Sequence, residues 1–145
     1  MEQTLEIEEG QVFTTPTKTL TDAHFLFFSG LTGDNHPIHY DIEYCKARGH
    51  RNMLAHGFQA LIQTAPGAGD FPFYIGDSLV GFIEQSSRFL KPVYAGDTVY
   101  PLLTISELTP QNTTGVVTMT STVHNQRREL VLEGDQKFLL KKRPA

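Results

Sequence analysis

Several features are scarce in this chain of 145 residues, and each scarcity excludes a class of protein. The single cysteine, Cys45, cannot form a disulfide within the chain, which is typical of a reducing compartment. Twelve basic residues against sixteen acidic ones give a net charge of −4, without the excess of positive charge that nucleic-acid and membrane-surface binders carry. The longest apolar stretches, such as Phe25–Phe28, are far shorter than the roughly 18 residues of a membrane helix. We therefore expect a cytoplasmic protein that binds neither nucleic acid nor membrane.

The composition is that of an ordinary globular protein. Hydrophobic residues make up 39% of the chain and charged residues 19%, and the sequence contains no internal repeat or linker. The stretch rich in Pro and Gly from Pro66 to Gly76 is interpreted as a long loop inside a domain. We expect one domain covering residues 1–145.

The first half of the chain predicts one short strand and two helices. A strand is expected over Val12–Lys18, followed by a helix that Thr19 or Thr21 caps and that ends near Gly30 or Gly33. A second, buried or half-buried helix is expected to begin at Gly57 and to end before Pro66. Its apolar positions recur at helical spacing, while Gln59 and Gln63 face elsewhere; these positions are Phe58, Leu61, Ile62 and Ala65.

The second half predicts an antiparallel sheet. Four runs rich in Val, Ile, Thr and Phe are separated by turns, namely Gly81–Leu90, Thr98–Leu108, Gly115–His124 and Glu129–Leu140. Pro101 lies inside one of these runs and indicates a sheet edge or a bulge. A sheet of about five strands with one apolar face, together with a strongly apolar helix, favours an α+β architecture in which the sheet wraps around the helix.

The histidines are clustered. Four of the six fall between positions 36 and 56, namely His36, His39, His50 and His56. Asp34 and His39 are five residues apart, a spacing that separates two side chains by roughly 140° on a helix. Gly33 and Pro37 disfavour a helix there, so the two side chains converge only if the loop folds back, which suits general acid–base catalysis.

Two other interpretations of this loop stay open. In the first, Asp34 and Asn35 make turn or capping hydrogen bonds and the histidines are structural. In the second, a metal ion is bound by a set whose spacing matches no standard zinc pattern: Asp34, His36 and His39, with Asp41 or His56.

Gly57 is the second feature with chemical potential. The first N–H groups of a helix have no intrahelical acceptor and lie at the positive end of the helix dipole, so they can bind an oxyanion. Glycine lets a substrate carbonyl approach closely. Alternatively, Gly57 simply allows the chain to turn or the helix to pack.

Three segments together resemble the MaoC-like dehydratases, which include the (R)-specific 2-enoyl-CoA hydratases. They are GDNHPIH (Gly33–His39), LAHG (Leu54–Gly57) and RFLKPVYAGDTV (Arg88–Val99). The resemblance implies the hot-dog fold, an antiparallel sheet wrapped around a long central helix. It also implies an enzyme that interconverts a trans-2-enoyl-CoA and an (R)-3-hydroxyacyl-CoA without a metal or redox cofactor. The expected assembly is a homodimer or a larger assembly of dimers.

The same resemblance assigns roles to residues. Asp34 and His39 match the catalytic dyad, and the Gly57 amide matches the donor to the thioester oxygen, with His56 beside it. His36 stands where the family usually has Asn, and it is interpreted as orienting the dyad, admitting a polar acyl group or only packing. Two other functions stay open, a hot-dog thioesterase and a noncatalytic acyl-CoA-binding module.

Some aromatic residues have two interpretations. They lie within the Pro66–Gly76 stretch or shortly after it and serve either as core residues or as the lining of an acyl pocket; they are Phe71, Phe73, Tyr74 and Phe82.

Overall fold

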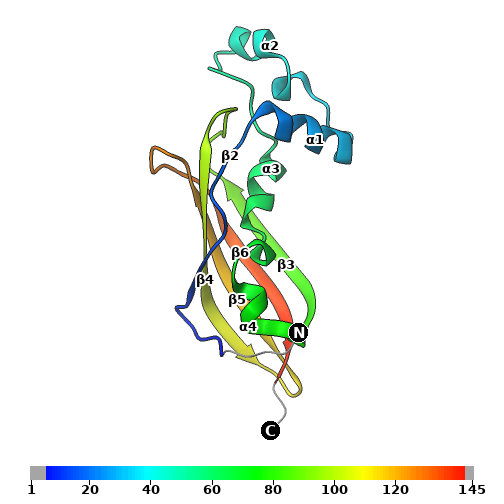
Figure 1. The fold of residues 1–145 in the computed structure, drawn as a ribbon, viewed down its shortest axis with the longest axis vertical. Helices are drawn as coiled ribbons and strands as arrows, with labels where there is room; N and C mark the ends of the chain where they lie inside the picture. The colour runs from blue at the N-terminus through cyan, green and yellow to red at the C-terminus, as the bar shows by residue number, and fades with distance from the viewer. Residues whose placement is uncertain (1–5, 143–145) are drawn as a thin grey trace.

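The computed structural model describes residues 6–142 and contains the expected antiparallel sheet (Figure 1). Its long strands are β3 (Leu79–Phe89), β4 (Thr98–Pro110), β5 (Thr114–His124) and β6 (Leu130–Lys141). Together with the N-terminal strand β1 they form one path of neighbours, β1-β4-β5-β6-β3. The four predicted runs are therefore confirmed, each to within a few residues. Strand β3 lies at one edge of the sheet.

The N-terminal strand is divided in two. Both β1 (Val12–Thr14) and β2 (Lys18–Thr19) pair with β4, and Pro16 lies in the break between them. Pro101 of β4 lies opposite this break, between the residues that pair with β1 and those that pair with β2. Proline has no N–H to donate, so it is tolerated at a point where no neighbouring strand needs that hydrogen bond. Strand β4 is an inner strand, so the predicted sheet edge or bulge at Pro101 is wrong; the proline is tolerated because it lies opposite the break between β1 and β2.

Helix α1 (Asp22–Thr32) has the expected ends. Thr21 is its N-cap residue, and the Thr21 N–H donates to His24 Nδ1 at 3.0 Å. Gly33 ends the helix with φ at +79°, a left-handed conformation that residues with a Cβ rarely adopt. A 3₁₀ turn, η1 (Pro37–His39), and helix α2 (Ile42–Ala47) follow.

A broken helical segment runs along the concave side of the sheet (Figure 1). Helix α3 (Gly57–Leu61) continues as the 3₁₀ turn η2 (Ile62–Thr64). The expected long loop after it is wrong, since it contains further helical turns: η3 (Pro66–Ala68), α4 (Phe71–Ile75) and η4 (Gly76–Ser78). Phe71 is the reason, because its buried ring contacts Phe13 and Phe138 and so anchors α4 to the sheet.

The central segment, made of α3 and η2 (residues 57–64), buries a different face from the one that the spacing of its apolar residues predicted. Phe58 is 63% exposed and Ile62 is 50% exposed, whereas Gln59 is buried. The segment packs on the sheet through Gln59, Ala60 and Thr64, and the change to 3₁₀ geometry after Leu61 alters the helical period. Phe58 and Ile62 are thus left on the surface of the single chain, whereas Leu61 packs against the core.

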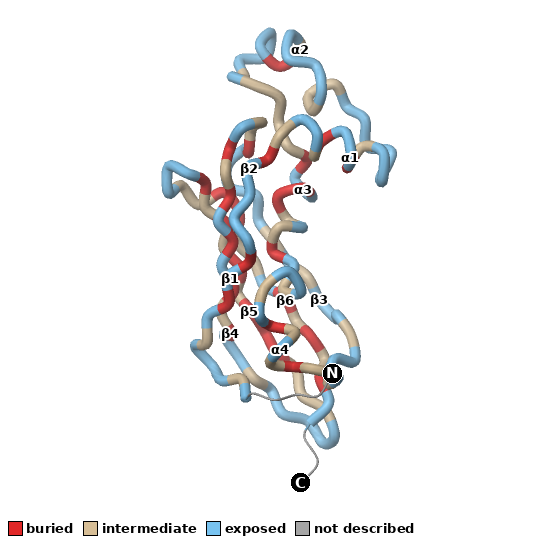
Figure 2. The backbone as a smooth tube through the Cα atoms, in the orientation of Figure 1, coloured by how far each residue is buried: buried red, intermediate tan, exposed pale blue. Residues whose placement is uncertain are grey.

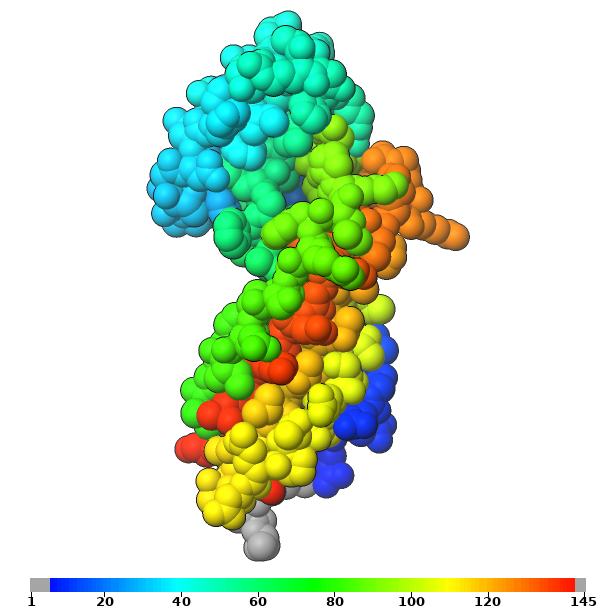
Figure 3. Space-filling model, turned by 180° about the vertical axis from the view of Figure 1, so that it is seen from behind, coloured from blue at the N-terminus to red at the C-terminus, as the bar shows by residue number. Residues whose placement is uncertain are grey.

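The molecule is elongated, and the segment that joins α1 to α2 lies near one end (Figure 1). Figure 2 shows buried residues concentrated on β4, β5 and β6 and mostly exposed ones around α2. Seen from behind, the segment around α2 forms that end, beyond the sheet (Figure 3). Within residues 6–142 no helix is long and apolar enough to cross a membrane.

Candidate active site

Asp34, His39 and His56 come together although they belong to three separate segments. Asp34 directly follows the left-handed Gly33, His39 ends the 3₁₀ turn η1, and His56 precedes α3. One ligand-type atom from each of the three lies within 4.8 Å of the others. The fold-back that the spacing of Asp34 and His39 required is therefore present, and it is made by the Gly33 turn followed by η1.

His39 is held in a defined tautomer. Its Nδ1 lies 2.7 Å from the carbonyl oxygen of Leu54, which only accepts, so Nδ1 carries the proton and Nε2 has a free lone pair. Partial burial is the main cause that lowers the pKa of His39 below 6.5, and it outweighs the opposite effect of the Leu54 hydrogen bond. His39 is therefore neutral at pH 7 and able to take a proton at Nε2.

His56 contacts both His39 and Asp34. It is 2% exposed, and its ring stacks on that of His39 with centroids 3.6 Å apart. Its Nε2 donates to the backbone carbonyl of Asp34 at 3.0 Å and contacts Ser29 Oγ at 3.3 Å. His56 therefore fixes the backbone of one member of the pair and the ring of the other. The sequence pattern had placed His56 beside the thioester oxygen or in a metal set, and had not predicted this supporting role.

Gly57 begins α3, so its N–H has no intrahelical acceptor. It lines a cavity of about 200 Å³ together with His56, Phe89 and Lys91. A Cβ at position 57 would lie 3.3 Å from Cε1 of Phe89, which is tighter than ordinary van der Waals contact. Glycine thus keeps open the space between the helix start and the Phe89 ring.

His36 occupies a capping position beside the pair. Its Nδ1 accepts the N–H of Ile38 at 3.1 Å and so caps η1, a bond that an Asn side chain also makes at such a position. Its exposed ring meets His39 edge-on with centroids 6.4 Å apart. Of its three interpretations, the capping bond supports orientation of the segment that carries His39.

Asp97 was missed by the sequence reasoning as a site-building residue. It is 1% exposed, and its carboxylate accepts hydrogen bonds from Arg51 at 2.7 and 2.9 Å, from Gln126 at 2.8 Å and from the Tyr94 N–H at 2.9 Å. Burial raises the pKa of Asp97, but these hydrogen bonds outweigh burial and hold the pKa below its ordinary value. The Gly96-Asp97 pair directly before strand β4 was the signal that could have pointed to it.

This cluster positions Leu54. The Ala55 N–H donates to the carbonyl of Val93 at 2.8 Å, and the Ala95 N–H donates to the carbonyl of Met53 at 2.9 Å. Leu54 thereby forms a bridge with Tyr94, in the turn that Asp97 holds. The carbonyl that orients His39 is consequently tied to a buried carboxylate in another part of the chain.

The structure reduces the set of candidate metal ligands to three residues. Asp34, His39 and His56 are close enough to share an ion. Asp41 instead caps α2 by accepting the N–H groups of Glu43 and Tyr44. In the set that remains, Nδ1 of His39 and Nε2 of His56 both bond to backbone carbonyls. Nε2 of His39 and Nδ1 of His56 are thus the nitrogens that could serve as metal ligands.

Other charged and aromatic residues have varied surroundings. Three basic side chains form ion pairs with acidic ones: Arg51 with Asp97, Arg88 with Glu133 and Lys91 with Glu129. Among the aromatic residues, Phe71 is a core residue, Phe73 is 60% exposed and Phe82 lines a second cavity.

Comparison with known proteins identifies the family. The model of the MaoC-like domain matches residues 4–127, most of the chain. The chain belongs to the MaoC-like domain family. It is 29% identical over 134 residues to the (R)-specific enoyl-CoA hydratase of Rhodospirillum rubrum, covering 90% of this chain and 85% of that protein.

Solved structures share the fold of this chain. A protein of Archaeoglobus fulgius, described as a monoamine oxidase regulatory protein, superimposes with a TM-score of 0.87 at 31% identity, covering 95% of this chain and 93% of that one. Rv0216 of Mycobacterium tuberculosis, described as a double hot-dog fold, gives a TM-score of 0.79 at 22% identity, and the match covers 95% of this chain and 43% of that one. The expected hot-dog fold, with a sheet wrapped around a central helix, is confirmed.

Proposed function

We propose that this enzyme is a hydratase that interconverts a trans-2-enoyl-CoA and an (R)-3-hydroxyacyl-CoA. The observation that carries the proposal is the free Nε2 lone pair of His39 beside the Asp34 carboxylate, with the tautomer set by Leu54. The (R)-specific enoyl-CoA hydratase of Rhodospirillum rubrum, similar over most of both chains, supports the reaction type and the stereochemistry.

The proposed chemistry balances with water as the only co-reactant. His39 Nε2 takes a proton from a water that Asp34 orients, and the water oxygen bonds to C3 of the enoyl thioester. The C2=C3 electron pair moves toward the thioester, so negative charge develops on its oxygen, where the Gly57 N–H donates. The dyad then returns a proton to C2, and the reverse sequence removes water.

One experiment tests the reaction type. The protein is incubated with crotonyl-CoA while enoyl-thioester absorbance is followed, with a thiol-trapping dye present and chiral analysis of the product. We expect 3-hydroxybutyryl-CoA of R configuration without free thiol. Stoichiometric thiol release with no hydroxyacyl thioester would instead identify a thioesterase, which delivers water to C1. An S product would leave the reaction type standing and remove the assigned stereochemistry.

The reaction is proposed to need no metal or redox cofactor, because a neutral base and a helix-start N–H suffice for addition to a polarised thioester. Treatment with EDTA followed by gel filtration is expected to leave turnover unchanged. Loss of activity that returns with an added divalent ion would assign the Asp34, His39 and His56 set to metal binding.

A cytoplasmic location is also proposed. The single cysteine, Cys45, is a buried free thiol, which supports a reducing compartment.

A homodimer is the proposed assembly. Large apolar side chains are exposed on two neighbouring helices: Phe27 (72%) and Leu31 (71%) on α1, and Phe58 and Ile62 on the central segment. Within residues 6–142, strand β3 pairs on one side only and so adds a sheet edge. Such faces and edges promote association unless a partner covers them. Sedimentation equilibrium at micromolar concentration is expected to give twice the chain mass of 16.2 kDa or a multiple of it; a fully active 16.2 kDa species would contradict the proposal.

A further inference from the structure

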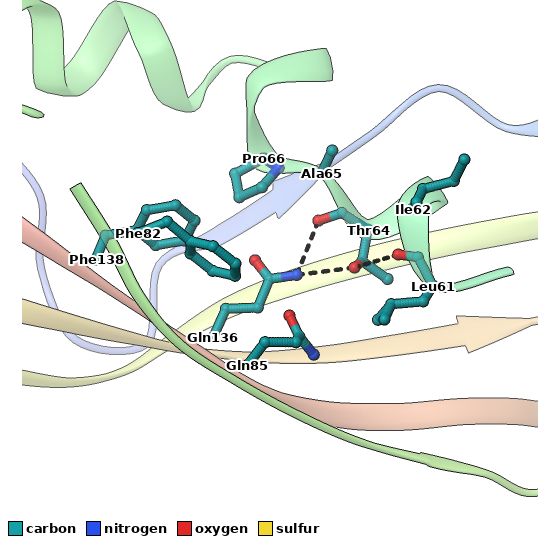
Figure 4. Close-up of a pocket in the computed structure, with 9 residues that line it drawn as sticks. All are labelled: Leu61, Ile62, Thr64, Ala65, Pro66, Phe82, Gln85, Gln136 and Phe138. Carbon is teal, nitrogen blue, oxygen red and sulfur yellow. Dashed lines mark hydrogen bonds between the residues drawn. The ribbon is translucent and has the colours of Figure 1, made fainter. Parts of the chain in front are cut away.

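A second cavity lies farther along the central segment, between η2 and strands β3 and β6 (Figure 4). Its volume is about 320 Å³, at the lower end of the range of small-molecule sites. Most of its lining is apolar, including Leu61, Pro66, Phe82 and Phe138. Three polar residues interrupt this lining, namely Thr64, Gln85 and Gln136.

Gln136 is held in one orientation. It is 3% exposed, and its Nε2 donates to the Thr64 carbonyl at 3.2 Å and to Thr64 Oγ1 at 2.8 Å. The Thr64 hydroxyl donates its hydrogen bond to the carbonyl of Leu61 at 2.7 Å, so Oγ1 can only accept from Gln136. Because both partners are acceptors, the amide nitrogen must face Thr64 and the amide oxygen must face the other way.

That oxygen has no hydrogen-bond partner among residues 6–142, although it is buried. Figure 4 shows it on the side of Phe82 and Phe138, away from Thr64. Gln85 lies directly opposite Gln136 in the β3–β6 register, and its own Nε2 donates to Ser87 Oγ at 2.6 Å. Buried acceptors without a donor are rare in folded proteins, so each asks for an explanation.

We propose that this cavity binds an apolar chain that carries a hydroxyl group, whose O–H donates to Gln136 Oε1. The lining contains no ionisable residue, so a carboxylate would meet an acceptor and an ammonium group would lack a counter-ion. A neutral donor on an apolar chain satisfies both the oxygen and the surrounding rings. Resting on the function proposed above, the chain is the acyl group of a hydroxylated thioester.

The distance to Gly57 sets the position of the hydroxyl. Thr64 is seven residues beyond Gly57, with four steps at the α-helical rise of about 1.5 Å and three at the 3₁₀ rise of about 2.0 Å, which corresponds to about 12 Å. An extended chain advances about 1.2 Å per bond, so the hydroxyl oxygen should lie about ten bonds from the thioester carbonyl. The matching acyl group is 10-hydroxydecanoyl, and undecanoyl has the same length with a methyl group in place of the hydroxyl.

The test measures binding of two saturated thioesters, which have no double bond to hydrate. Calorimetric titration of the full chain with 10-hydroxydecanoyl-CoA and with undecanoyl-CoA compares a hydroxyl with a methyl at one position. We expect the hydroxylated ligand to bind at least tenfold more tightly, since the methyl leaves the buried oxygen unpaired. Equal affinities in the unmodified protein overturn the proposal without any need for a variant.

Two variants assign the effect to the oxygen. Gln136→Met keeps the length of the side chain but removes the acceptor, so the preference for the hydroxylated ligand should disappear. Thr64→Val is the matched control, because it changes the same network while the Thr64 carbonyl still holds the amide nitrogen; here the preference should persist. If Gln136→Met keeps the preference, the hydroxyl is recognised elsewhere and the proposal fails.

Two remaining outcomes are also decisive. If Gln136→Met weakens both thioesters equally, the oxygen accepts from an amide N–H of the pantetheine arm, which both ligands share, and the acyl assignment is wrong. Turnover of crotonyl-CoA, whose acyl chain is too short to reach the oxygen, reports on the hydratase function separately. Turnover without hydroxyl preference overturns only this inference, whereas hydroxyl preference without turnover overturns only the proposed reaction.

Discussion

Two substitutions of His39 can separate its hydrogen bond to the Leu54 carbonyl from its capacity to act as a base. The imidazole uses Nδ1 for the 2.7 Å bond to the Leu54 carbonyl and leaves Nε2 for chemistry. The amide nitrogen of Asn can occupy the Nδ1 position, whereas that of Gln reaches the Nε2 position. His39→Asn therefore keeps the structural bond and removes the base, and His39→Gln removes both.

The two variants should differ in stability and agree in activity. Loss of a positioned base costs about 10²-fold or more in kcat, which corresponds to about 2.7 kcal/mol of activation free energy. Loss of the Leu54 hydrogen bond in the Gln variant costs about 1 kcal/mol of the free energy of unfolding, or about 3 °C in Tm for a chain of this size. The Asn variant should unfold close to the unmodified protein, because its amide replaces the donor.

Hydration of crotonyl-CoA, followed by loss of enoyl-thioester absorbance, gives kcat, and thermal unfolding followed by circular dichroism gives Tm. Both variants should fall to one hundredth of the unmodified turnover or less, with the lower Tm confined to His39→Gln. A folded His39→Asn protein that keeps more than a tenth of the turnover would show that Nε2 is not the base.

Four further outcomes are expected. Asp34→Asn should lower kcat by about 10²-fold while Tm is retained, and unchanged turnover would refute its role. His36→Asn should change kcat by less than about threefold, because Asn preserves the cap on Ile38; a larger loss would assign the imidazole a direct role. The pKa of His39 is lowered from 6.5, so kcat/KM should hold through pH 6.5 and fall only below it; a fall centred above 6.5 would contradict this. Asp97→Ala should lose about 2–3 kcal/mol in urea unfolding, and a change below about 0.5 kcal/mol would remove its positioning role.

The long strands and the loop chemistry could be predicted from local sequence. Alternation of Val, Met and Thr along β5 is a period of two that no helix satisfies, and it predicted a strand with one apolar face. Gly33 and Pro37 likewise predicted that Asp34 and His39 lie on a folded-back loop rather than on a helix. The Gly57 helix start and the Gly-Asp turn at Asp97 were visible as patterns, although only the first was assigned a function.

The exposed faces of helices could not be predicted in the same way. Phe58 and Ile62 have helical spacing, which predicts a shared face but not what covers that face. Whether such a face meets the chain's own sheet or remains on the surface depends on how the sheet curves. The structure leaves both side chains exposed and buries Gln59 instead.

Local sequence determined which segments become strands, helices and turns, because those choices depend on residues within a few positions of one another. Tertiary structure alone decided the tautomer of His39 and the pairing of Gln136, since each depends on a carbonyl far away in the chain, that of Leu54 and that of Thr64. A hydrogen bond is directional and short-ranged, so it is settled only when the sheet has brought its two partners within about 3 Å. The unprotonated Nε2 of His39 and the buried Oε1 of Gln136 without a partner among residues 6–142 are therefore properties of the fold.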